Sequence, residues 1–495
     1  MRTLLSADWV VGFEDGRHVL WQDGEVVFTG NTIEFVGPAF PGVVDRRIDY
    51  GRAVIGPGFI DLDALGDLDT EVLTFDNGPG KNLGRIWTED ALRRGPTETY
   101  TREEELFKYR YAFTQLLANG ITTALPITSM LYRAWAESYD EMAGVAAIAA
   151  EMGLRVYLGP CFMSGLTYQR ADGCLAQHWD EPRGLAGLAE AEQFIADYDS
   201  HASGRIRAFL APDRIETQTP AVLARMSDVQ KASGVALRLH CCQSVYEFEL
   251  VRKLRGHTPL GWLEDLRLLG ERAILPHGIY VSGHPQVSLE GDEDLRRLVG
   301  SGATIAHCPL VFGRDGEHLS SFAAYQARGV RFGMGTDTFP ADMVANIRLG
   351  LMLSHQDQVA PPATAADLYT AATLGGARAL GRDDLGRIAC GAKADVTVFD
   401  LGGFHLGQVL DPIKSMVLAG SGRDFRDVWV DGVRLVKDFK VKAANTEALT
   451  GQADKQFLKA RQTHAHRAPG HPAVEDMFQP AFKNRSKDRR LLVER

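Results

Sequence analysis

Apolar residues recur along the chain in two rhythms, which separate a central region from the two ends. Near each end, short runs such as WVVGF, HVLWQ and DVWVDGVRLV alternate apolar with polar positions and are bounded by Asp-Gly, Gly-Asn or Gly-Pro pairs. This alternation with turn dipeptides is typical of antiparallel strands and hairpins. We therefore expect residues 1–56 and 386–445 to combine into one small β-sandwich.

The central region, residues 57–385, alternates short apolar runs with helical stretches. Runs that are apolar on both faces favour parallel strands covered by helices, and eight such units indicate a closed barrel. The runs are GFIDLD (58–63), ITTALPI (121–127), RVYLGP (155–160), RIRAFLAP (205–212), VALRLH (235–240), AILPHGI (273–279), TIAHCP (304–309) and RFGMGTD (331–337). The pattern predicts an α/β fold, a (β/α)8 TIM barrel with a composite β-sandwich formed by both chain ends.

One helix is marked at its start and its end. Thr101 and Glu104 have the spacing of a capping box, and Gly120 stops the helical pattern just before the second apolar run. Residues 446–495 are polar, and we expect them to form a C-terminal tail with at most a short helix around residues 456–461.

Composition narrows the class of protein. The 495 residues are 45% hydrophobic and 24% charged, which is typical of a globular enzyme. A net charge of -10 argues against a nucleic-acid partner. No stretch approaches the ~18 uninterrupted apolar residues of a membrane span, and no signal-peptide pattern opens the chain. Six scattered cysteines lack zinc-finger spacing. We expect a cytoplasmic protein with reduced thiols that acts on a small molecule and forms a homo-oligomer.

The segment GPGFIDLDALGDLD (56–69) ends an apolar run in a series of aspartates. Asp and Gly are common in polar turns, so an ordinary turn is one interpretation. A carboxylate in an apolar interior, however, must be paired, hydrogen-bonded or bound to a cation. The segment therefore raises the alternative that Asp61 and Asp63 belong to a functional site.

Other titratable residues fall at equivalent positions in later runs. Active sites of such barrels lie at the C-terminal ends of the strands. There the fifth, sixth, seventh and eighth runs carry His240, His277, His307 and Asp337. Imidazoles and carboxylates that converge from several strands are the ligands that a divalent cation needs. The sequence thus predicts a metal site at this end of the barrel.

Several motifs in order resemble the amidohydrolase superfamily. They are PGFID (57–61), GITT (120–123), the strand with His240, PHG (276–278), AHCP (306–309) and GTD (335–337), and the segment GRIACGAKADVTVFDL resembles that superfamily's composite β-sandwich. The resemblance covers about residues 1 to 440 and is strongest to the branch of cytosine deaminase and triazine hydrolases. It implies a divalent metal that activates water to attack a C–N bond, with Asp337 as metal ligand and base and His240 as metal ligand.

The chain departs from this branch at two motifs. The family's His-x-His positions hold Asp63 and Leu65, and Gln243 in HCCQ stands where the branch has a proton-shuttling glutamate. No lysine ends the fourth run to bridge two metals. These changes favour one divalent ion, zinc or else cobalt, manganese or iron, held by His240, His277, Asp337 and Asp63. The altered first motif is also similar to hydrolases of phenylureas and of thiocarbamates such as molinate.

We therefore expect a metal-dependent hydrolase that cleaves an amide, urea, carbamate or thiocarbamate bond in a small, partly apolar molecule. A metal lowers the pKa of bound water from ~15.7 to about 7. Asp337 would move the proton, and His277 or His307 would polarise the carbonyl. The side chains of Gln243, Phe162 and Trp87 would contact the substrate.

Two other functions are compatible with the same residues. An aminohydrolase or dechlorinating hydrolase of a heteroaromatic ring would need Glu247 or a water to replace the glutamate absent at Gln243. A barrel that has lost its metal site would have no catalytic role, and Leu65 is the kind of change with which such a loss begins. The retained His240, His277 and Asp337 argue against that third possibility.

Overall fold

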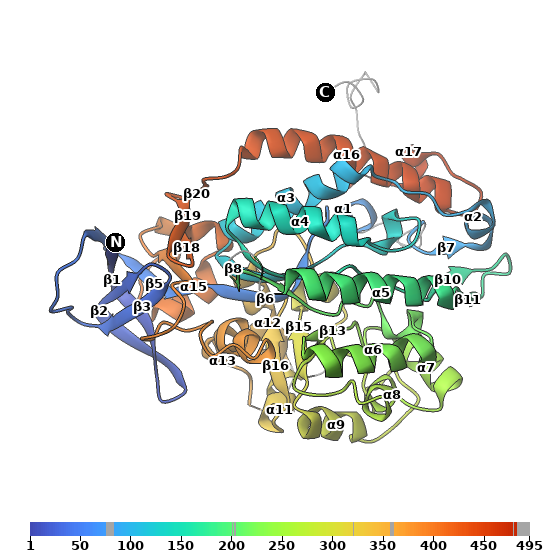
Figure 1. Ribbon diagram of the computed structural model, residues 1–495, viewed down its shortest axis with the longest axis horizontal. Helices are drawn as coiled ribbons and strands as arrows, with labels where there is room; N and C mark the ends of the chain where they lie inside the picture. The colour runs from blue at the N-terminus through green and yellow to red at the C-terminus, as the bar shows by residue number, and fades with distance from the viewer. Residues whose placement is uncertain are drawn as a thin grey trace.

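The computed structural model describes residues 1–75, 84–199, 201, 204–319, 321–356, 361–478 and 480–482. An eight-stranded barrel sheet forms the body of the molecule, and a nine-stranded sheet lies at one end of it (Figure 1). Both the first strands and the strands after residue 395 belong to that second sheet. The predicted barrel with an added β-domain from both chain ends is confirmed.

Parallel pairing runs through the barrel in the order β12-β9-β8-β6-β16-β15-β14-β13. The strands are β6 (Phe59–Leu65), β8 (Ile121–Ile127), β9 (Arg155–Leu158), β12 (Ile206–Ala208), β13 (Leu237–Arg238), β14 (Ala273–Pro276), β15 (Thr304–His307) and β16 (Arg331–Met334). A parallel bridge between Leu210 and Leu237 joins the two ends of this order and closes the barrel. Ile60, Leu125 and Phe209 belong to a buried cluster drawn from several of its strands.

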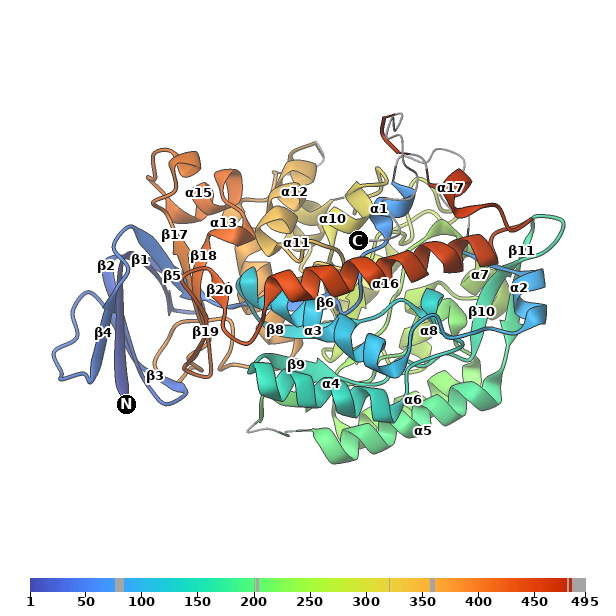
Figure 2. The ribbon, with the colours of Figure 1, turned by 90° about the horizontal axis from the view of Figure 1, so that it is seen from above.

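Helices follow most of the barrel strands and pack outside them (Figures 1 and 2). They are α3 (Arg102–Ala118), α4 (Tyr139–Met152), α5 (Glu181–Tyr198), α6 (Pro220–Ser233), α7 (Val245–Arg255), α8 (Pro259–Asp265), α9 (Glu293–Ser301), α11 (Phe322–Ala327), α12 (Met343–Gln356), α13 (Ala365–Thr370) and α14 (Gly376–Ala379). Shorter helices are α1 (Glu71–Thr74), α2 (Glu89–Arg94), α10 (Pro309–Gly313) and α15 (Pro412–Ala419). The capping box of α3 is formed as predicted: Thr101 N donates to Glu104 at 2.9 Å and Glu104 N donates to Thr101 at 3.3 Å.

The nine-stranded sheet joins the chain ends through antiparallel pairing of β5 with β17. Its strands are β1 (Arg2–Glu14), β2 (Arg17–Thr29), β3 (Thr32–Gly37), β4 (Arg46–Asp49), β5 (Ala53–Pro57), β17 (Val396–Asp400), β18 (Phe425–Val430), β19 (Val433–Lys437) and β20 (Lys440–Val441). Asp431 and Gly432 have φ values of 49° and 73°, as the tight hairpin between β18 and β19 requires. A separate small sheet holds β7 (Trp87–Thr88), β10 (Gly165–Gln169) and β11 (Leu175–Trp179).

The C-terminal region is not the polar tail that the sequence predicts. Residues Thr446–Arg467 form one long helix, α16, followed by α17 (Val474–Met477). Helix α16 lies across α3 (Figures 1 and 2), where Ala453 packs in a cluster with Phe107. Ala460 packs in a second cluster with Tyr100 and Tyr132, which lie outside α3. Its few apolar residues suffice because α3 and these two tyrosines cover them.

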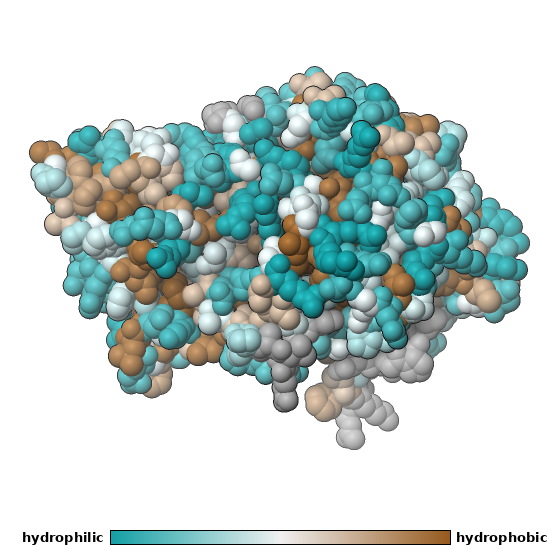
Figure 3. All heavy atoms as spheres, turned by 90° about the horizontal axis from the view of Figure 1, so that it is seen from below, coloured by the Kyte–Doolittle hydropathy of each residue, from teal (hydrophilic) through white to brown (hydrophobic). Residues whose placement is uncertain are grey.

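No helix among the described residues is long and apolar enough to cross a bilayer. The face in Figure 3 is mostly hydrophilic, with hydrophobic side chains scattered over it. The expected cytoplasmic location and homo-oligomeric state stay predictions.

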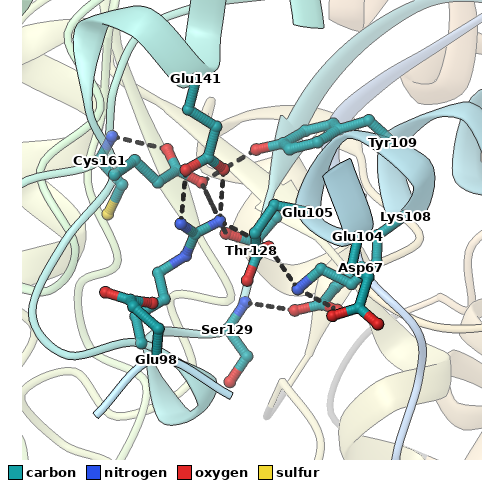
Figure 4. Close-up of polar contacts among 12 residues, drawn as sticks. Asp67, Glu98, Glu104, Glu105, Lys108, Tyr109, Thr128, Ser129, Glu141 and Cys161 are labelled. Atoms are coloured by element: carbon teal, nitrogen blue, oxygen red, sulfur yellow. Dashed lines mark hydrogen bonds and ion pairs between the residues drawn. The ribbon is translucent and has the colours of Figure 1, made fainter. Parts of the chain in front are cut away.

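A buried network of charges fastens the loop after β6 to the neighbouring elements (Figure 4). Lys108 of α3 forms ion pairs with Asp67 at 2.9 Å and with Glu105 at 2.6 Å, and all three side chains are at most 4% exposed. The second oxygen of Asp67 accepts a hydrogen bond from Ser129 N, just after β8, at 3.1 Å. The loop that continues the first strand is therefore fixed to the second strand and to α3.

A second cation continues this network toward the third strand. Arg133 pairs with Glu141 of α4 at 2.6 Å and with Glu105 at 3.1 Å. Glu137, in the same network, accepts hydrogen bonds from the Tyr109 hydroxyl at 2.9 Å and from Cys161 N, beyond β9, at 2.7 Å. The carboxyl ends of three adjacent strands are thus held by buried, paired charges.

Lys108→Met should lower the free energy of unfolding by about 3–5 kcal/mol, because the buried carboxylates of Asp67 and Glu105 lose the ammonium group that pairs with them. Urea unfolding of the variant and the parent protein measures the difference. Lys459→Met is the matched control, since Lys459 pairs with Glu104 at 2.6 Å but is 41% exposed. That variant should lose less than about 1 kcal/mol. Equal losses in both variants would contradict the role given to the buried network.

Candidate metal centre

Asp61 and Asp63 lie within strand β6, which continues to Leu65, and both are fully buried. Asp61 accepts hydrogen bonds from the Thr336 hydroxyl at 2.5 Å, from Thr336 N at 3.0 Å and from Asp63 N at 3.2 Å. Burial raises the pKa of Asp61 to about 7 against the opposing effect of these hydrogen bonds. This carboxyl group therefore serves to join the first strand to the loop after β16.

Asp63 lies in a cluster with His240 and His277, from the loops after β13 and β14. Its Oδ2 atom is 3.6 Å from His240 Nε2 and 4.0 Å from His277 Nε2. Ligand atoms around a tetrahedral zinc ion are about 3.4 Å apart when each is about 2.1 Å from the metal. The spacing of the three atoms is close to that of ligands around one ion.

The orientation of the two imidazoles also suits a metal. The carbonyl of Asp213 lies 3.0 Å from His240 Nδ1, which fixes the ring with Nε2 directed toward Asp63. Both ring nitrogens of His277 and the Oδ1 atom of Asp63 are buried without a hydrogen-bond partner among the described residues. Buried polar atoms are costly when unsatisfied, and a divalent cation between Asp63 Oδ2 and His277 Nε2 would satisfy that ring nitrogen.

Asp337 lies at the open side of this cluster. Its Oδ2 atom is 3.7 Å from His277 Nε2, and the side chain is 17% exposed. The backbone N of Asp337 donates to the carbonyl of Asp63 at 2.8 Å, and its φ of 44° turns the chain away from β16. Burial, and next the charge of Asp63, hold the pKa of Asp337 well above its usual value.

The protonation states of the inner residues match those of metal ligands. Burial opposes ionisation of Asp63, but His240, Arg238 and His277 outweigh it and lower its pKa to about 2. Burial, assisted by the nearby His240, lowers the pKa of His277 to about 3. An ionised carboxylate and a neutral imidazole are the forms that bind a divalent cation.

Three further residues contact the cluster and were absent from the predicted site. Arg238 Nη1 lies 3.5 Å from Asp63 Oδ1, and Cys308 Sγ lies 3.8 Å from Asp63 Oδ2. The Phe312 ring packs edge-on against His277, with centroids 4.6 Å apart. Arg238 could have been found, because an arginine inside the apolar run VALRLH requires a buried anion.

His307 is not part of the metal cluster, contrary to the prediction that it acts in catalysis. Its ring packs against Phe322 and Phe332, with centroids 5.5 Å and 6.3 Å away. It pairs in register with Met334 and shares a face of β15 with Ile305, in the core that surrounds the barrel. Alternate residues of a strand point to opposite faces, and His307 falls on the outer one.

The predicted substrate contacts are distributed widely. Phe162 is 1% exposed and belongs to the main hydrophobic core, whereas Trp87 lies on β7 with the Arg467 guanidinium 4.0 Å from its ring. Gln243, by contrast, is half-buried just after the ligand His240, and its Oε1 atom has no hydrogen-bond partner among the described residues. The substrate-binding roles of Phe162, Trp87 and Gln243 stay predictions.

Asp67 and Asp69 follow strand β6 in a loop. Asp67 belongs to the buried network with Lys108. Asp69 accepts hydrogen bonds from Arg314 at 2.8 Å, the Thr338 hydroxyl at 2.7 Å and Phe339 N at 3.0 Å. The loop after the first strand is thereby attached to the loops after the seventh and eighth.

Comparison with known proteins shows that this chain is similar to hydrolases. Residues 89–435 match the model of the Amidohydrolase family. A 5-methylthioadenosine/S-adenosylhomocysteine deaminase of Natronomonas pharaonis is 27% identical over 441 residues, which cover 88% of this chain and 91% of the relative. The 8-oxoguanine deaminase of Pseudomonas aeruginosa is 28% identical over 441 residues, 86% of this chain and 92% of the relative.

Solved structures share the fold over nearly the whole chain. An adenosine deaminase from Xanthomonas campestris with bound zinc has a TM-score of 0.74 and 20% identity, covering 93% of this chain and 98% of that one. Atrazine chlorohydrolase from Arthrobacter aurescens, complexed with zinc, has a TM-score of 0.73 and 20% identity over 92% of this chain and 100% of that one. Both neighbours contain zinc, and the present fold brings together residues that could hold such an ion.

Elemental analysis of the purified protein should find about one divalent ion per chain, since the cluster offers ligands for a single ion. His240→Ala and Asp63→Ala should each lose most of that metal. His307→Gln should keep it, because the His307 ring faces the outer core. Two ions per chain, or a loss of metal in His307→Gln equal to that in His240→Ala, would show that the ligand assignment is wrong.

Proposed function

The chain belongs to the amidohydrolase family, and on that premise we propose that it is a metal-dependent hydrolase acting on a carbon–nitrogen bond of a small molecule. One observation carries the proposal: Asp63 Oδ2 lies 3.6 Å from His240 Nε2 and 4.0 Å from His277 Nε2, in a buried cluster. Retention of this cluster argues against a barrel without catalytic function. The deaminase relatives support the same type of bond.

Asp63, His240 and His277 would hold one divalent ion, with Asp337 beside them. When bound, such an ion supplies Lewis acidity, which acidifies water and polarises a C=O or C=N group. Two imidazoles with carboxylates favour zinc, and cobalt, manganese and iron accept the same donors. Zinc in two structural neighbours supports the first choice.

Asp337 is the residue that would move protons during the reaction. It is 17% exposed and lies 3.7 Å from His277 Nε2, so its carboxyl group borders both the ligand cluster and the solvent-accessible side. A general acid–base residue needs a pKa near the working pH, and the raised pKa of Asp337 moves in that direction. It would accept a proton from the attacking water and deliver it to the leaving atom. The predicted polarising role of His277 stays secondary to its role in holding the ion.

We infer an amide, urea, carbamate or thiocarbamate as the substrate group. Gln243 cannot transfer protons, because a carboxamide is neutral. Glu247 is 1% exposed and accepts hydrogen bonds from Cys242 N at 2.6 Å and from Gln243 N at 2.8 Å. Both of its carboxylate oxygens are therefore engaged by backbone N–H groups. Acyl hydrolysis needs only one proton carrier, and Asp337 can fill that role.

Deamination or dechlorination of a heteroaromatic ring is the second candidate. The names of the curated relatives favour it, because both of those described act on amino groups of purine compounds. This reaction would require a second acid in addition to Asp337. The two candidates differ in their products: a carboxylic, carbamic or thiocarbamic fragment in the first, and a ring hydroxyl with released ammonia or chloride in the second.

Asp337→Asn should lower kcat by about 100-fold or more while the protein keeps its fold, because proton transfer contributes at least that factor. A panel of ureas, amides, thiocarbamates and amino-substituted heterocycles, analysed by mass spectrometry with the zinc-loaded protein, would identify the cleaved bond. Glu249→Gln, which changes an acid that pairs with Arg252 and Ser288, is the control and should keep full activity. Turnover of heteroaromatic amines alone would overturn the acyl assignment, and undiminished activity of Asp337→Asn would remove its proposed role.

A further inference from the structure

Arg214 lies next to the metal ligand His240. It follows β12, where a parallel bridge pairs Arg214 with His240 and Ile215 N donates to the His240 carbonyl at 3.1 Å. The preceding residue, Asp213, supplies the carbonyl that contacts His240 Nδ1. The same backbone segment that orients the ligand therefore carries the arginine.

The Arg214 side chain is accessible to solvent, yet carboxyl groups of neighbouring elements influence its charge. Its side chain is exposed, yet burial is the largest influence on its pKa and lowers it. Four carboxyl groups outweigh burial and raise that pKa, namely those of Asp213, Glu216, Glu247 and Asp337. The guanidinium is therefore open to solvent at a position where several carboxyl groups lie close to it.

Arg214 lies on the same side of the sheet as His240, because residues bridged across neighbouring strands point to the same face. The charge of Arg214 lowers the pKa of His277 and opposes the rise in the pKa of Asp337. Both effects require the guanidinium to be near these side chains, since Coulomb interactions fade with distance and with solvent. Arg214 thus extends the site from the ligands toward the place where a substrate would lie.

No partner satisfies this cation in the part of the chain that the structure describes. Its guanidinium has neither a hydrogen bond nor a carboxylate within ion-pair distance there, although the buried Arg133, Arg155 and Arg238 all have them. A guanidinium offers a planar fork that matches a carboxylate. An unpaired fork beside an active centre is suited to an anionic ligand.

Two unsatisfied acceptors belong to residues that lie close in sequence to Arg214 and His240, and they indicate the rest of the ligand. Glu216 is 8% exposed, and its Oε2 atom is buried without a hydrogen-bond partner among the described residues. The Oε1 atom of Gln243, three residues after His240, is also buried without a hydrogen-bond partner among the described residues. Both oxygens need N–H donors, and the substrate group proposed above supplies them if it is a urea or a primary amide.

We propose that Arg214 binds a carboxylate of the substrate, so that this hydrolase acts on small anions in which a carboxylate and a urea or amide group are joined by a short linker. This substrate class rests on the proposed function. A singly charged carboxylate is favoured over a phosphate dianion because four carboxyl groups surround Arg214 and would repel the additional charge.

The test compares ω-ureido carboxylic acids, in which a short chain of methylene groups joins a terminal urea to a carboxylate, with the corresponding neutral primary amides. In the zinc-loaded wild-type protein, kcat/KM for at least one acid should exceed that of its amide by about tenfold or more. Arg214→Gln should bring this ratio close to one, and Arg214→Lys should restore part of it. Arg225→Gln is the matched control, because Arg225 pairs with Glu192 and is 52% exposed; the ratio should stay at the wild-type value.

Calorimetry with the same compounds separates this inference from the proposed function. If neither compound is hydrolysed, the acyl assignment fails, but tighter binding of the acid that is lost in Arg214→Gln still supports the carboxylate site. Equal affinity for acid and amide in the wild-type protein overturns the inference. A preference for the acid that persists in Arg214→Gln also overturns it, because the carboxylate would then bind elsewhere, for example to the metal.

Discussion

Aspartates in an apolar interior must each obtain a partner, and this constraint organises the open end of the barrel. The first strand and its loop carry four of them, Asp61, Asp63, Asp67 and Asp69. Thr336 bonds the first and Lys108 pairs with the third, while Arg314 and Thr338 hold the fourth. Only Asp63 is directed at imidazoles, and its Oδ1 atom has no hydrogen-bond partner among the described residues. Structural pairing of the other three leaves this one carboxylate for the proposed metal centre.

The use of a carboxylate in place of an imidazole changes the charge of the centre. Asp63 and Asp337 together would neutralise a divalent ion, whereas a site rich in histidine would remain positive. Arg238, 3.5 Å from Asp63, and Arg214, beside His240, add positive charge around the ligands. Arg238 is buried against Asp63, but the Arg214 side chain is exposed. The carboxylates would thus neutralise the metal ion, and the guanidinium of Arg214 would be the positive charge available to a substrate. This accounts for the proposed selectivity for anions.

The sequence predicted those features that depend on local pattern. Eight apolar runs, the capping box at Thr101 and the Asp431–Gly432 hairpin are each encoded within a few residues, and all are present. Helix α16 was missed because Ala453 and Ala460 become buried only when Phe107 of α3 and the tyrosines Tyr100 and Tyr132 pack against them. His307 was assigned to the site because it ends a run, but position in a run does not specify the face of the strand. Arg214 was missed because it lies just past Pro212, where the apolar run stops, and only the closed barrel places it beside His240.

The most direct test of this account is anomalous diffraction at the zinc absorption edge from a crystal of the zinc-loaded protein. The central claim is that Asp63 has replaced an imidazole as a ligand and holds one ion with His240 and His277. The account predicts a single strong anomalous peak about 2.0–2.2 Å from Asp63 Oδ2, His240 Nε2 and His277 Nε2. A peak that the Asp63 carboxylate does not contact, or two peaks of comparable height in the barrel, would contradict it.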